Sequence, residues 1–596
     1  MSGGMGNLAL EGGDPRGGSI SGFNQPTVTG TPGTVTTSAL NHKLHDPNVS
    51  FEEYLYYAKI SRENAKYEDQ DYSMNLFRQS RYYKPDGADH GNAAMTDATM
   101  TAGAIDKELA GEKDRRSSNS PEYAVITEEE YVTASRAARN ATWVAVFYLI
   151  TTDILGPFST PWAFWKLGYA PGTILYVIFG AFAGFGGYLL WRIFLGMDSD
   201  KYPLKTYGDI AFRVFGTVCR HGVNILQSVQ LLFNVGIIVI SNGQSLSQIA
   251  NFNTCFIVLC IVWAFAGMIL GQIRTLQRLG WLANAAIWMN LFVIFFTMGI
   301  VAHSPPNFSA GVASNQVALG PVQTTVGPGV GINFTGQVVG LMQAVYSYGG
   351  AMLFVEFMAE MRRPWDFWKG MLCAQTFIFF FYLLFGLFIY SYQGQFSINP
   401  AFQGISSYAW QTVANSVGLV SGLIAALLYG NIGIKVIYNN VLIDFFNFPS
   451  LITKKGKILW CAVVPTYWAV AFIISAAIPQ VGNLGGLIAA VCILQFSYTF
   501  PPFFMIGYNV KKDAMLEGEG FNPETGVNTR HDSGMGRWIR GYKKQLLYNS
   551  FLTLFFLGSA ATAVLGTYSA AVQIQEAYAA GSPPSFSCRS PLQPAS

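Results

Sequence analysis

Charged residues are scarce in this chain of 596 residues. Asp, Glu, Lys and Arg together make up 12% of it, against 51% for hydrophobic residues. Because an ordinary soluble protein carries about 25% charged residues, this composition argues against a soluble globular fold. Successive apolar runs reach the roughly 20 residues needed to cross the hydrocarbon core of a bilayer. The chain is therefore predicted to be an all-α polytopic membrane protein.

Cysteine and histidine are also rare, with 7 and 6 residues. The cysteines lie mostly within or beside apolar runs, and their spacing matches neither a disulfide framework nor a CxxC metal site. We interpret them as small packing residues. The histidines lie in the N-terminal region, in loops or at span ends, and no span contains a His/Glu cluster or Gly-x-Ser-x-Gly. We expect no enzyme, metal site, organic cofactor or nucleic-acid partner.

An apolar segment is missing near Met1, so no cleavable signal peptide is expected and the first span itself should target the chain. Residues 1–140 are polar and rich in Gly, Ser, Thr, Asn and Asp. This composition predicts a disordered cytosolic tail that serves trafficking or ubiquitin machinery. Residues 141–570 should form the transmembrane domain, and residues 571–596 a short extracytoplasmic tail.

The apolar runs after Ala141 divide into about 11 spans, each bounded by polar residues or by Pro, Gly and Asn. We place these spans at residues 142–166, 172–194, 221–249, 253–271, 281–302, 335–358, 368–391, 408–435, 458–478, 484–508 and 546–570.

Basic residues indicate the orientation, because they accumulate in cytoplasmic loops. With the N-terminus in the cytosol, Lys and Arg fill the loops on that side, and only Lys166 and Arg589 lie on the other. The sequons at Asn307 and Asn333 fall in the long loop opposite the basic side, which predicts glycosylation there. The C-terminus is then predicted to lie outside, most simply at a plasma membrane.

The first span contains residues that break helices, in the stretch "TTDILGPFSTPWAFWKLG" from Thr151 to Gly168. A continuous helix through Gly156 and Pro157 would lose backbone hydrogen bonds in hydrocarbon, where each costs several kcal/mol. Secondary transporters use such interruptions, because half-helix ends offer free N–H and C=O groups to a charged substrate. An amino acid zwitterion carries an ammonium and a carboxylate on neighbouring atoms, so one interruption can bind both charged groups.

The sixth span carries a second interruption, in "VYSYGGAMLFVEFMAEMRRPWDFWKG", at Gly349 and Gly350. Inverted-repeat transporters place their second broken helix five spans after the first, as here. A near-identical hexapeptide follows each interruption, at residues 161–166 (PWAFWK) and 364–369 (PWDFWK). The hexapeptides lie at different distances from the two interruptions, so their similarity alone does not establish an internal repeat.

These segments resemble the amino acid/auxin permease (AAAP) family, and within it the fungal neutral amino acid permeases of the methyltryptophan-resistance type. The similar pieces are "TDILGPFSTPWAFWKLGYAPG", "YGDIAFRVFG", "YSYGGAMLFVEFMAEMRRPWDFWKG" and "IPQVGNLGGLIAAV". The resemblance implies a LeuT-like five-plus-five inverted repeat with an eleventh helix, and proton-driven uptake of neutral amino acids. One difference is Ile154-Leu155-Gly156, where many relatives have Gly-x-Gly.

The side chains at the two interruptions predict the substrate class. They are aromatic, small or hydroxyl-bearing, with Gln230 and Asn234 of the third span as further hydrogen-bonding groups. A cationic or dicarboxylate substrate needs a fixed countercharge, so neutral aliphatic and aromatic amino acids are favoured. The predicted substrate-binding residues are Gly156, Pro157, Phe158, Ser159, Tyr346, Ser347, Tyr348, Gly349 and Gly350.

Two carboxylates are candidates for proton coupling, Asp153 beside the first interruption and Glu356 after the second. Ionisable residues inside a membrane are costly, which makes them functional candidates. Sodium-coupled relatives of the fold carry a Ser/Thr pair on the inner half of span eight, and residues 423–435 contain neither Ser nor Thr. Protons are therefore preferred over sodium. An exporter of the vacuolar membrane and a receptor that binds without transport stay open as alternatives.

Overall fold

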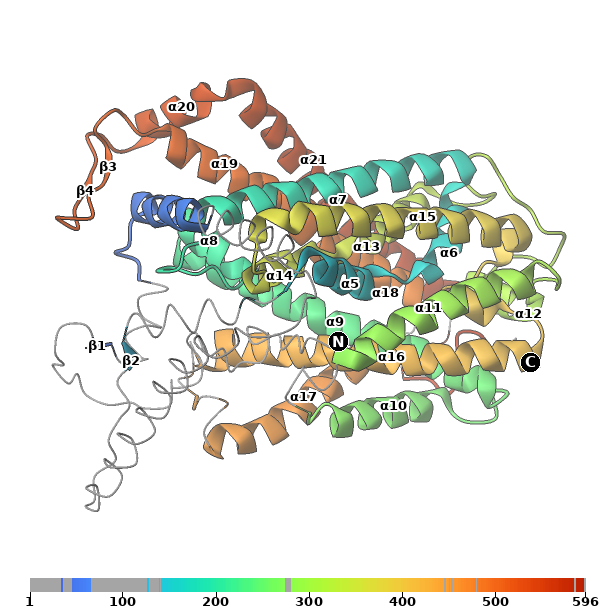
Figure 1. Cartoon of the computed structure of the whole chain (residues 1–596). Helices are drawn as coiled ribbons and strands as arrows, with labels where there is room; N and C mark the ends of the chain where they lie inside the picture. Colours follow the sequence, from blue (N-terminus) through green and yellow to red (C-terminus); the bar gives the residue numbers. More distant parts are fainter. Residues whose placement is uncertain are drawn as a thin grey trace, which may run out of the picture.

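The computed structural model in Figure 1 describes residues 46–65, 141–273, 280–443, 454–478, 480–581 and 586–593, with a few isolated positions beside them. Long helices run side by side through most of this part of the chain (Figure 1). The apolar helices are α5 (Trp143–Ile154), α6 (Thr160–Leu167), α7 (Tyr169–Met197), α9 (Thr217–Ile249), α10 (Phe256–Leu270), α11 (Gly280–Val301), α13 (Phe334–Ser347), α14 (Phe354–Glu360), α15 (Phe367–Gln393), α16 (Tyr408–Ile437), α17 (Lys454–Ala477), α18 (Val481–Ile488), α19 (Phe500–Asp513) and α21 (Leu546–Ala579).

Shorter elements connect the long helices. The connecting helices are α8 (Tyr207–Phe215), α12 (Phe308–Asn315) and α20 (Met535–Lys544). Antiparallel pairs join β1 (Thr34–Val35) to β2 (Ile126–Thr127) and β3 (Gly520–Phe521) to β4 (Asn528–Thr529). The 3₁₀ turns are η1 (Pro157–Ser159), η3 (Gly349–Leu353), η4 (Pro364–Asp366), η5 (Gly394–Phe396) and η6 (Ala401–Gly404), and the π-helical segments are η7 (Tyr438–Ile443), η8 (Ala489–Ile493) and η9 (Gln495–Thr499).

The prediction of an all-α polytopic membrane protein is confirmed. In the described part of the chain, 8 helices are long and apolar enough to cross a membrane, or 9 when the bent pair at α13 and α14 counts as one span. The two remaining predicted spans correspond to shorter apolar helices, Phe256–Leu270 and Ala285–Val301. At 1.5 Å per residue, a helix of 15 residues such as α10 is shorter than the roughly 30 Å hydrocarbon core.

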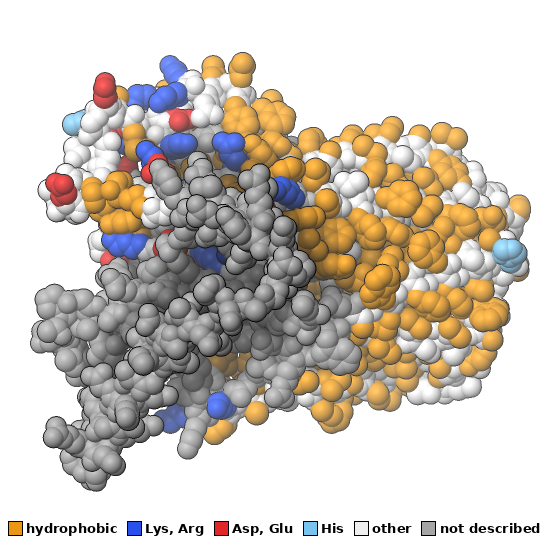
Figure 2. Space-filling model, in the orientation of Figure 1, with side chains coloured by type: hydrophobic (Ala, Val, Ile, Leu, Met, Phe, Trp, Pro, Cys, Tyr) orange, Lys and Arg blue, Asp and Glu red, His pale blue; other side chains and the backbone are white. Residues whose placement is uncertain are grey.

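Charged side chains gather at one end of the molecule. In Figure 2, Lys, Arg, Asp and Glu lie over α20 and the β3–β4 pair, whereas most of the face over α7, α15 and α11 is hydrophobic. We call the first end, which carries α8, α20, β3 and β4, the basic end. The band of exposed apolar side chains has the surface that lipid requires.

The opposite end is held by a disulfide between Cys255 and Cys588, and we call it the disulfide end. The interpretation of all cysteines as unpaired packing residues is wrong for these two. They lie 333 residues apart in sequence, so spacing gave no signal of their pairing. The segment after α21 also contributes Leu592, which is buried against Ala310 and Ile398. Helix α21 itself continues to Ala579, beyond the predicted end of the last span.

A helix over residues 51–65 lies within the predicted N-terminal tail, and we call it the N-terminal helix. Its Arg62 pairs with Asp198, which follows α7, at 3.1 Å, and its Glu52 pairs with Arg530, which follows β4, at 2.7 Å. For these residues the structure differs from the expectation of disorder. Most of the rest of residues 1–140 lies outside the described part of the chain.

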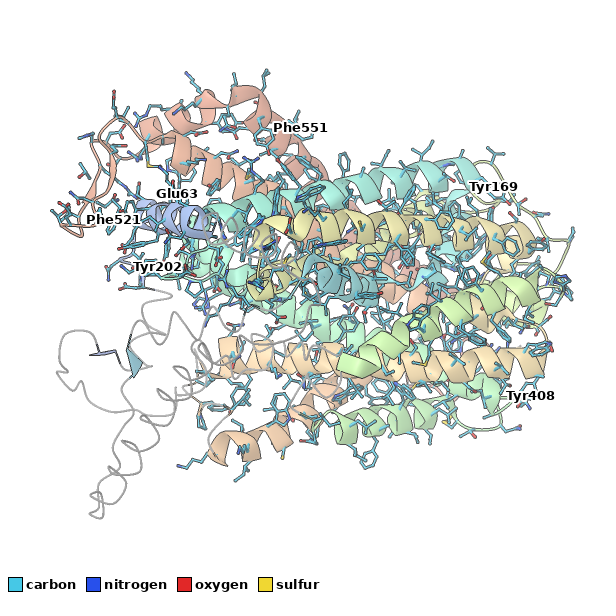
Figure 3. The ribbon with its side chains drawn as sticks, in the orientation of Figure 1. Glu63, Tyr169, Tyr202, Tyr408, Phe521 and Phe551 are labelled. Atoms are coloured by element: carbon cyan, nitrogen blue, oxygen red, sulfur yellow. A yellow bond between two sulfur atoms is a disulfide. The ribbon has the colours of Figure 1, made fainter. Side chains whose placement is uncertain are left out.

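Aromatic side chains fill the contact between the N-terminal helix and the basic end. The ring of Tyr57 lies 5.8 Å from that of Tyr202 and 5.8 Å from that of Phe521, centroid to centroid. Figure 3 shows Tyr202 and Phe521 beside the helix that carries Glu63. The N-terminal helix is therefore packed against loops from two distant parts of the sequence.

Candidate functional site

The first predicted interruption separates α5 from α6. Helix α5 ends at Ile154, and Gly156 takes an extended φ of −164°. Pro157 begins η1, and Pro161 stands in the first turn of α6, where a missing N–H breaks no helical hydrogen bond. The sequence thus places each proline at a helix start, which leaves α5 and α6 as two half-helices.

The second predicted interruption separates α13 from η3 and α14. The segments Phe334–Ser347 and Gly349–Glu360 meet at an angle of 41°. A Cβ on Gly349 would lie 2.8 Å from Cγ2 of Ile493, so a larger residue would have to displace this side chain of η8. The interruption is therefore packed directly against a π-helical segment, a distortion that is frequent at functional sites.

Three buried tyrosines lie at this second interruption, and we call them the tyrosine cluster: Tyr176 of α7, Tyr348, and Tyr382 of α15. Their ring centroids are 6.1 to 6.3 Å apart. Ser347 donates to the carbonyl of Gln343 at 2.8 Å, and its Oγ lies 3.4 Å from the Tyr176 hydroxyl. The Tyr348 hydroxyl is buried and has no hydrogen-bond partner among the described residues.

The free end of α5 is connected to α16 through a side-chain amide. Asn290 of α11 donates from Nδ2 to the Leu155 carbonyl at 2.9 Å. Its Oδ1 accepts from the Ser421 hydroxyl at 2.7 Å. The interruption leaves the Leu155 carbonyl without a helical N–H partner, and the neutral amide of Asn290 supplies the missing hydrogen bond.

Glu356 of α14 is buried inside the helix bundle. Its Oε1 accepts from Nε2 of Gln227 at 3.1 Å, and its Oε2 is buried without a partner in the described part of the chain. Gln227 belongs to a row of buried amides on α9 at spacings of three and four residues, which places them on one helix face. We call this row the amide stripe: Asn224, Gln227, Gln230 and Asn234.

Two oxygens of the amide stripe, Oε1 of Gln230 and Oδ1 of Asn234, are buried with no partner among the residues that the structure describes. A buried amide oxygen without a hydrogen bond costs free energy in an apolar environment. The stripe therefore offers acceptors to a ligand, a water molecule or a proton donor on the same side of α9 as Glu356.

The structure brings only part of the predicted site together. Ser347, Tyr348 and Gly350 are buried at the second interruption, with Tyr346 and Gly349 half-buried there. At the first interruption Pro157 is buried and Gly156 and Ser159 are half-buried. Phe158, by contrast, packs against Phe385 and Phe402 in a separate apolar cluster. Asp153 lies in the last turn of α5, and its side chain is outside those described.

Sequence reasoning missed several of these residues. Tyr176, Tyr382 and Gln227 come from spans two, seven and three, and nothing in their local sequence distinguishes them from packing residues. The amide stripe had a usable signal, since four amides at helical spacing are unusual in an apolar span. Only two of the four, Gln230 and Asn234, were selected.

Both predicted glycosylation residues cap helices on the side away from the basic end. Asn307 accepts from the backbone N–H of Ala310 at 3.2 Å at the start of α12. Asn333 accepts from the N–H of Gly336 at 2.8 Å at the start of α13. Asn333 is exposed and Asn307 is half-buried. Glycosylation of either residue stays a prediction.

Comparison with known proteins identifies the family. Residues 139–517 match the family model described as "Transmembrane amino acid transporter protein". A "Transmembrane transporter" of Gibberella moniliformis is 25% identical over 457 residues, covering 74% of this chain and 86% of that protein. The "N amino acid transport system protein" of Neurospora crassa is 24% identical over 389 residues, covering 63% of this chain and 78% of that protein. The family comprises membrane transporters rather than enzymes, and this chain belongs to the transmembrane amino acid transporter family.

Proposed function

We propose that this chain imports neutral L-amino acids, aliphatic and aromatic, by proton symport with alternating access. Family membership gives amino acid transport and a membrane location. The Neurospora crassa relative is named as an amino acid transport protein, which agrees with this substrate class.

The two interruptions support binding of a zwitterion. The half-helices leave backbone groups at membrane depth, where an ammonium or a carboxylate can replace the lost helical bonds. None of the residues from Leu155 to Ser159 or from Ser347 to Gly350 has a charged side chain. A neutral side chain lying against the tyrosine cluster needs no countercharge, whereas a charged side chain would lack one.

The buried carboxylate of Glu356 is the main support for proton coupling. One carboxylate oxygen is bound by Gln227, and the other is buried without a partner in the described residues. A carboxylate left in this state is costly in hydrocarbon, whereas a protonated carboxyl is neutral and can donate to an acceptor of the amide stripe. Glu356 can thus carry a proton inward and release it when water reaches α14. Asp153 stays a second candidate for the same role.

Sodium coupling is disfavoured by the connection between α5 and α16. A cation between these helices would take carbonyl and hydroxyl oxygens as ligands. Here the Leu155 carbonyl accepts from Asn290, and the Ser421 hydroxyl donates to the same amide. We therefore prefer the proton as coupling ion, with no organic cofactor.

The interruptions in spans one and six are those that a LeuT-like five-plus-five inverted repeat requires. We propose that α5–α6 and α13–α14 are its discontinuous helices. Rocking of one group of helices against the other then exposes the interruptions to each side in turn. This motion gives alternating access its structural basis.

The proposed orientation places the basic end in the cytosol and the disulfide end outside. Disulfides persist in oxidising compartments, which favours Cys255 and Cys588 on the outer side. Positive charges favour the cytosolic side for the basic end. We further propose the plasma membrane as the location, with the N-terminal tail available to trafficking or ubiquitin machinery.

Uptake of labelled leucine and phenylalanine tests the proposal, in cells that lack their own permeases, with outer pH and sodium varied independently. Accumulation that rises as outer pH falls and ignores sodium is expected, with Asp153→Asn run alongside to separate the two candidate carboxylates. Sodium-dependent uptake would overturn the coupling. Surface binding without accumulation would favour a receptor, and sequestration into isolated vacuoles would favour the vacuolar exporter.

A further inference from the structure

The two similar hexapeptides have different electrostatic surroundings. In the second copy, Lys369 pairs with Asp366, three residues earlier, at 2.6 Å. The first copy has Ala163 at the corresponding position, so Lys166 has no such carboxylate on its own helix. The one substitution between the copies therefore removes the partner of the lysine.

Lys166 makes contacts of another kind at the end of α6. Its ammonium lies 4.1 Å from the ring centroid of Trp165 and 5.2 Å from that of Trp162. Within the described part of the chain it has no hydrogen bond or ion pair at close range. Two indole faces orient the ammonium but leave its N–H donors free for a ligand.

The free ammonium opens into a cavity of about 280 Å³ at the disulfide end. The walls come from α6, α9, α12, α18, α21 and the segment after α21. Drug-sized ligands occupy pockets of roughly 300–1,000 Å³, so this volume fits a smaller molecule such as one amino acid. We call this cavity the vestibule.

Acidic and amide groups line the vestibule together with Lys166. Glu576 of α21 is one of its lining residues and interacts electrostatically with Lys166 without forming a close ion pair. The Glu576 carboxylate accepts from Nδ2 of Asn333 at 3.0 and 3.1 Å and from Nε2 of Gln573, one turn earlier on α21. The contact with Gln573 fixes its position even when a glycan replaces one hydrogen of the Asn333 amide. Nε2 of Gln480 is buried at the vestibule with no acceptor among the described residues.

We propose that the vestibule is a binding site for the zwitterion of a neutral amino acid, outside the two interruptions. Lys166 binds the carboxylate, Glu576 binds the ammonium, and Gln480 donates a further hydrogen bond. The indole rings of Trp162 and Trp165 supply apolar surface for the side chain. This proposal depends on the proposed function, because the vestibule would bind the substrate that the protein transports. From the vestibule the substrate would move along α6 to the interruption at Gly156.

The kinetics of leucine uptake test this site in Lys166→Gln and Glu576→Gln variants, with Lys369→Gln as the matched control from the second hexapeptide. Losing a hydrogen bond to a charged group costs about 1.5–3 kcal/mol, or roughly a tenfold or greater loss of affinity. We therefore expect KM to rise at least about tenfold in both vestibule variants. Maximal uptake per molecule at the cell surface should stay near the wild-type value, and Lys369→Gln should keep the wild-type KM.

A binding measurement on the purified full chain gives a second readout. At leucine concentrations close to the wild-type Kd, wild-type protein should bind a higher molar ratio of labelled leucine than Lys166→Gln, and Lys166→Arg should restore part of the loss. Unchanged KM and molar ratio in Lys166→Gln would overturn the site, as would a fall in maximal uptake alone, which indicates a structural role. Absence of uptake by the wild type would instead refute the proposed function. Absence of any leucine binding by the purified wild type would then refute the vestibule site as well.

Discussion

Unpaired polar atoms in the membrane interior distinguish the candidate site from ordinary helix packing. The Tyr348 hydroxyl, Oε2 of Glu356, and the amide oxygens of Gln230 and Asn234 are buried with no partner among the described residues. Each of these atoms costs free energy while it lacks a hydrogen bond, and a ligand, water molecule or proton can supply one. At the residue scale this is the physical reason to place substrate and proton at these positions.

Tyr348→Phe should change stability and affinity in opposite directions. Removing an unpaired buried hydroxyl relieves its desolvation, so the ligand-free protein should unfold at a higher temperature in detergent. If the hydroxyl binds substrate, leucine affinity should fall about five- to tenfold, as expected for one hydrogen bond of roughly 1 kcal/mol. Thermal unfolding and KM for uptake are the two measurements.

Tyr390→Phe is the matched control for that prediction. The Tyr390 hydroxyl accepts from the backbone N–H of Thr325 at 3.1 Å, so its removal should lower the unfolding temperature and leave KM unchanged. A Tyr348→Phe variant with lower stability and wild-type affinity would show that the hydroxyl has a structural role only.

Sequence predicted the backbone of the site better than its lining. Gly156, Pro157 and Gly349 mark the interruptions because their effect on a helix is local. Phe158 follows the same stretch, yet its side chain packs toward Phe385 and Phe402, a direction that depends on tertiary packing. Tyr382, from span seven, joins the site only through the fold.

At the element scale, one buried carboxylate holds three segments together at the basic end. Asp198, after α7, accepts from Arg139 before α5 at 2.8 and 2.9 Å, and from Arg62 of the N-terminal helix at 3.1 Å. Burial alone would raise the pKa of Asp198, but the charges and hydrogen bonds of Arg139 and Arg62 hold it well below the ordinary value. The ionised form therefore stabilises this junction.

Asp198→Asn should destabilise the protein, because it leaves two arginines without their shared anion. Breaking a buried ion pair by removing one partner costs about 3–5 kcal/mol. Since the folded-state pKa is depressed, the stabilisation is present above the ordinary aspartate pKa of about 4 and is lost as pH falls below it. The unfolding temperature of the purified wild type should therefore fall at acidic pH. The unfolding temperature of Asp198→Asn should change less with pH.

Asp532→Asn provides a contrast at the same end. Asp532 pairs with Arg537 and Arg540 at the surface, where ion pairs contribute little, so the unfolding temperature should change little. Equal effects of the two variants would contradict the role given to Asp198.

Sequence and structure also diverge at the element scale. The composition of residues 1–140 argued for disorder, yet residues 51–65 form a helix whose partners, Asp198 and Arg530, lie far along the chain. The composition of a segment cannot predict that it will pack against residues far away in the sequence. The π-helical segments η8 and η9 were missed for a similar reason, since they arise where span ten packs against the interruption at Gly349.

At the scale of the whole molecule, the two ends of the helix bundle have different chemistry. The basic end carries the N-terminal helix and α20, and the disulfide end carries Cys255–Cys588 and the vestibule. Tyr169 and Tyr408 lie at the disulfide end, opposite Tyr202 (Figure 3). The distribution of basic residues predicted this division, whereas the disulfide and the vestibule depend on how the C-terminal segment folds back.

Glycosylation measures the orientation of the whole molecule. With the disulfide end outside, the exposed Asn333 should carry a glycan, so Asn333→Gln should migrate faster on a gel unless an N-glycosidase removes glycans from both proteins. Asn48 and Asn140 begin sequons on the predicted cytosolic side, and their Gln variants should migrate like the wild type. A glycan on Asn140 would contradict the proposed orientation.

Leucine accumulation in proteoliposomes under an imposed pH gradient tests proton coupling through Glu356. The wild type is compared with Glu356→Gln and with Glu360→Gln, which changes a buried carboxylate one turn further along α14. We predict that the wild type and Glu360→Gln accumulate leucine against its gradient when the outside is acidic. Glu356→Gln should still exchange leucine across the membrane but lose accumulation, because its amide cannot carry the proton. Accumulation by Glu356→Gln at the wild-type level would contradict proton coupling through this residue.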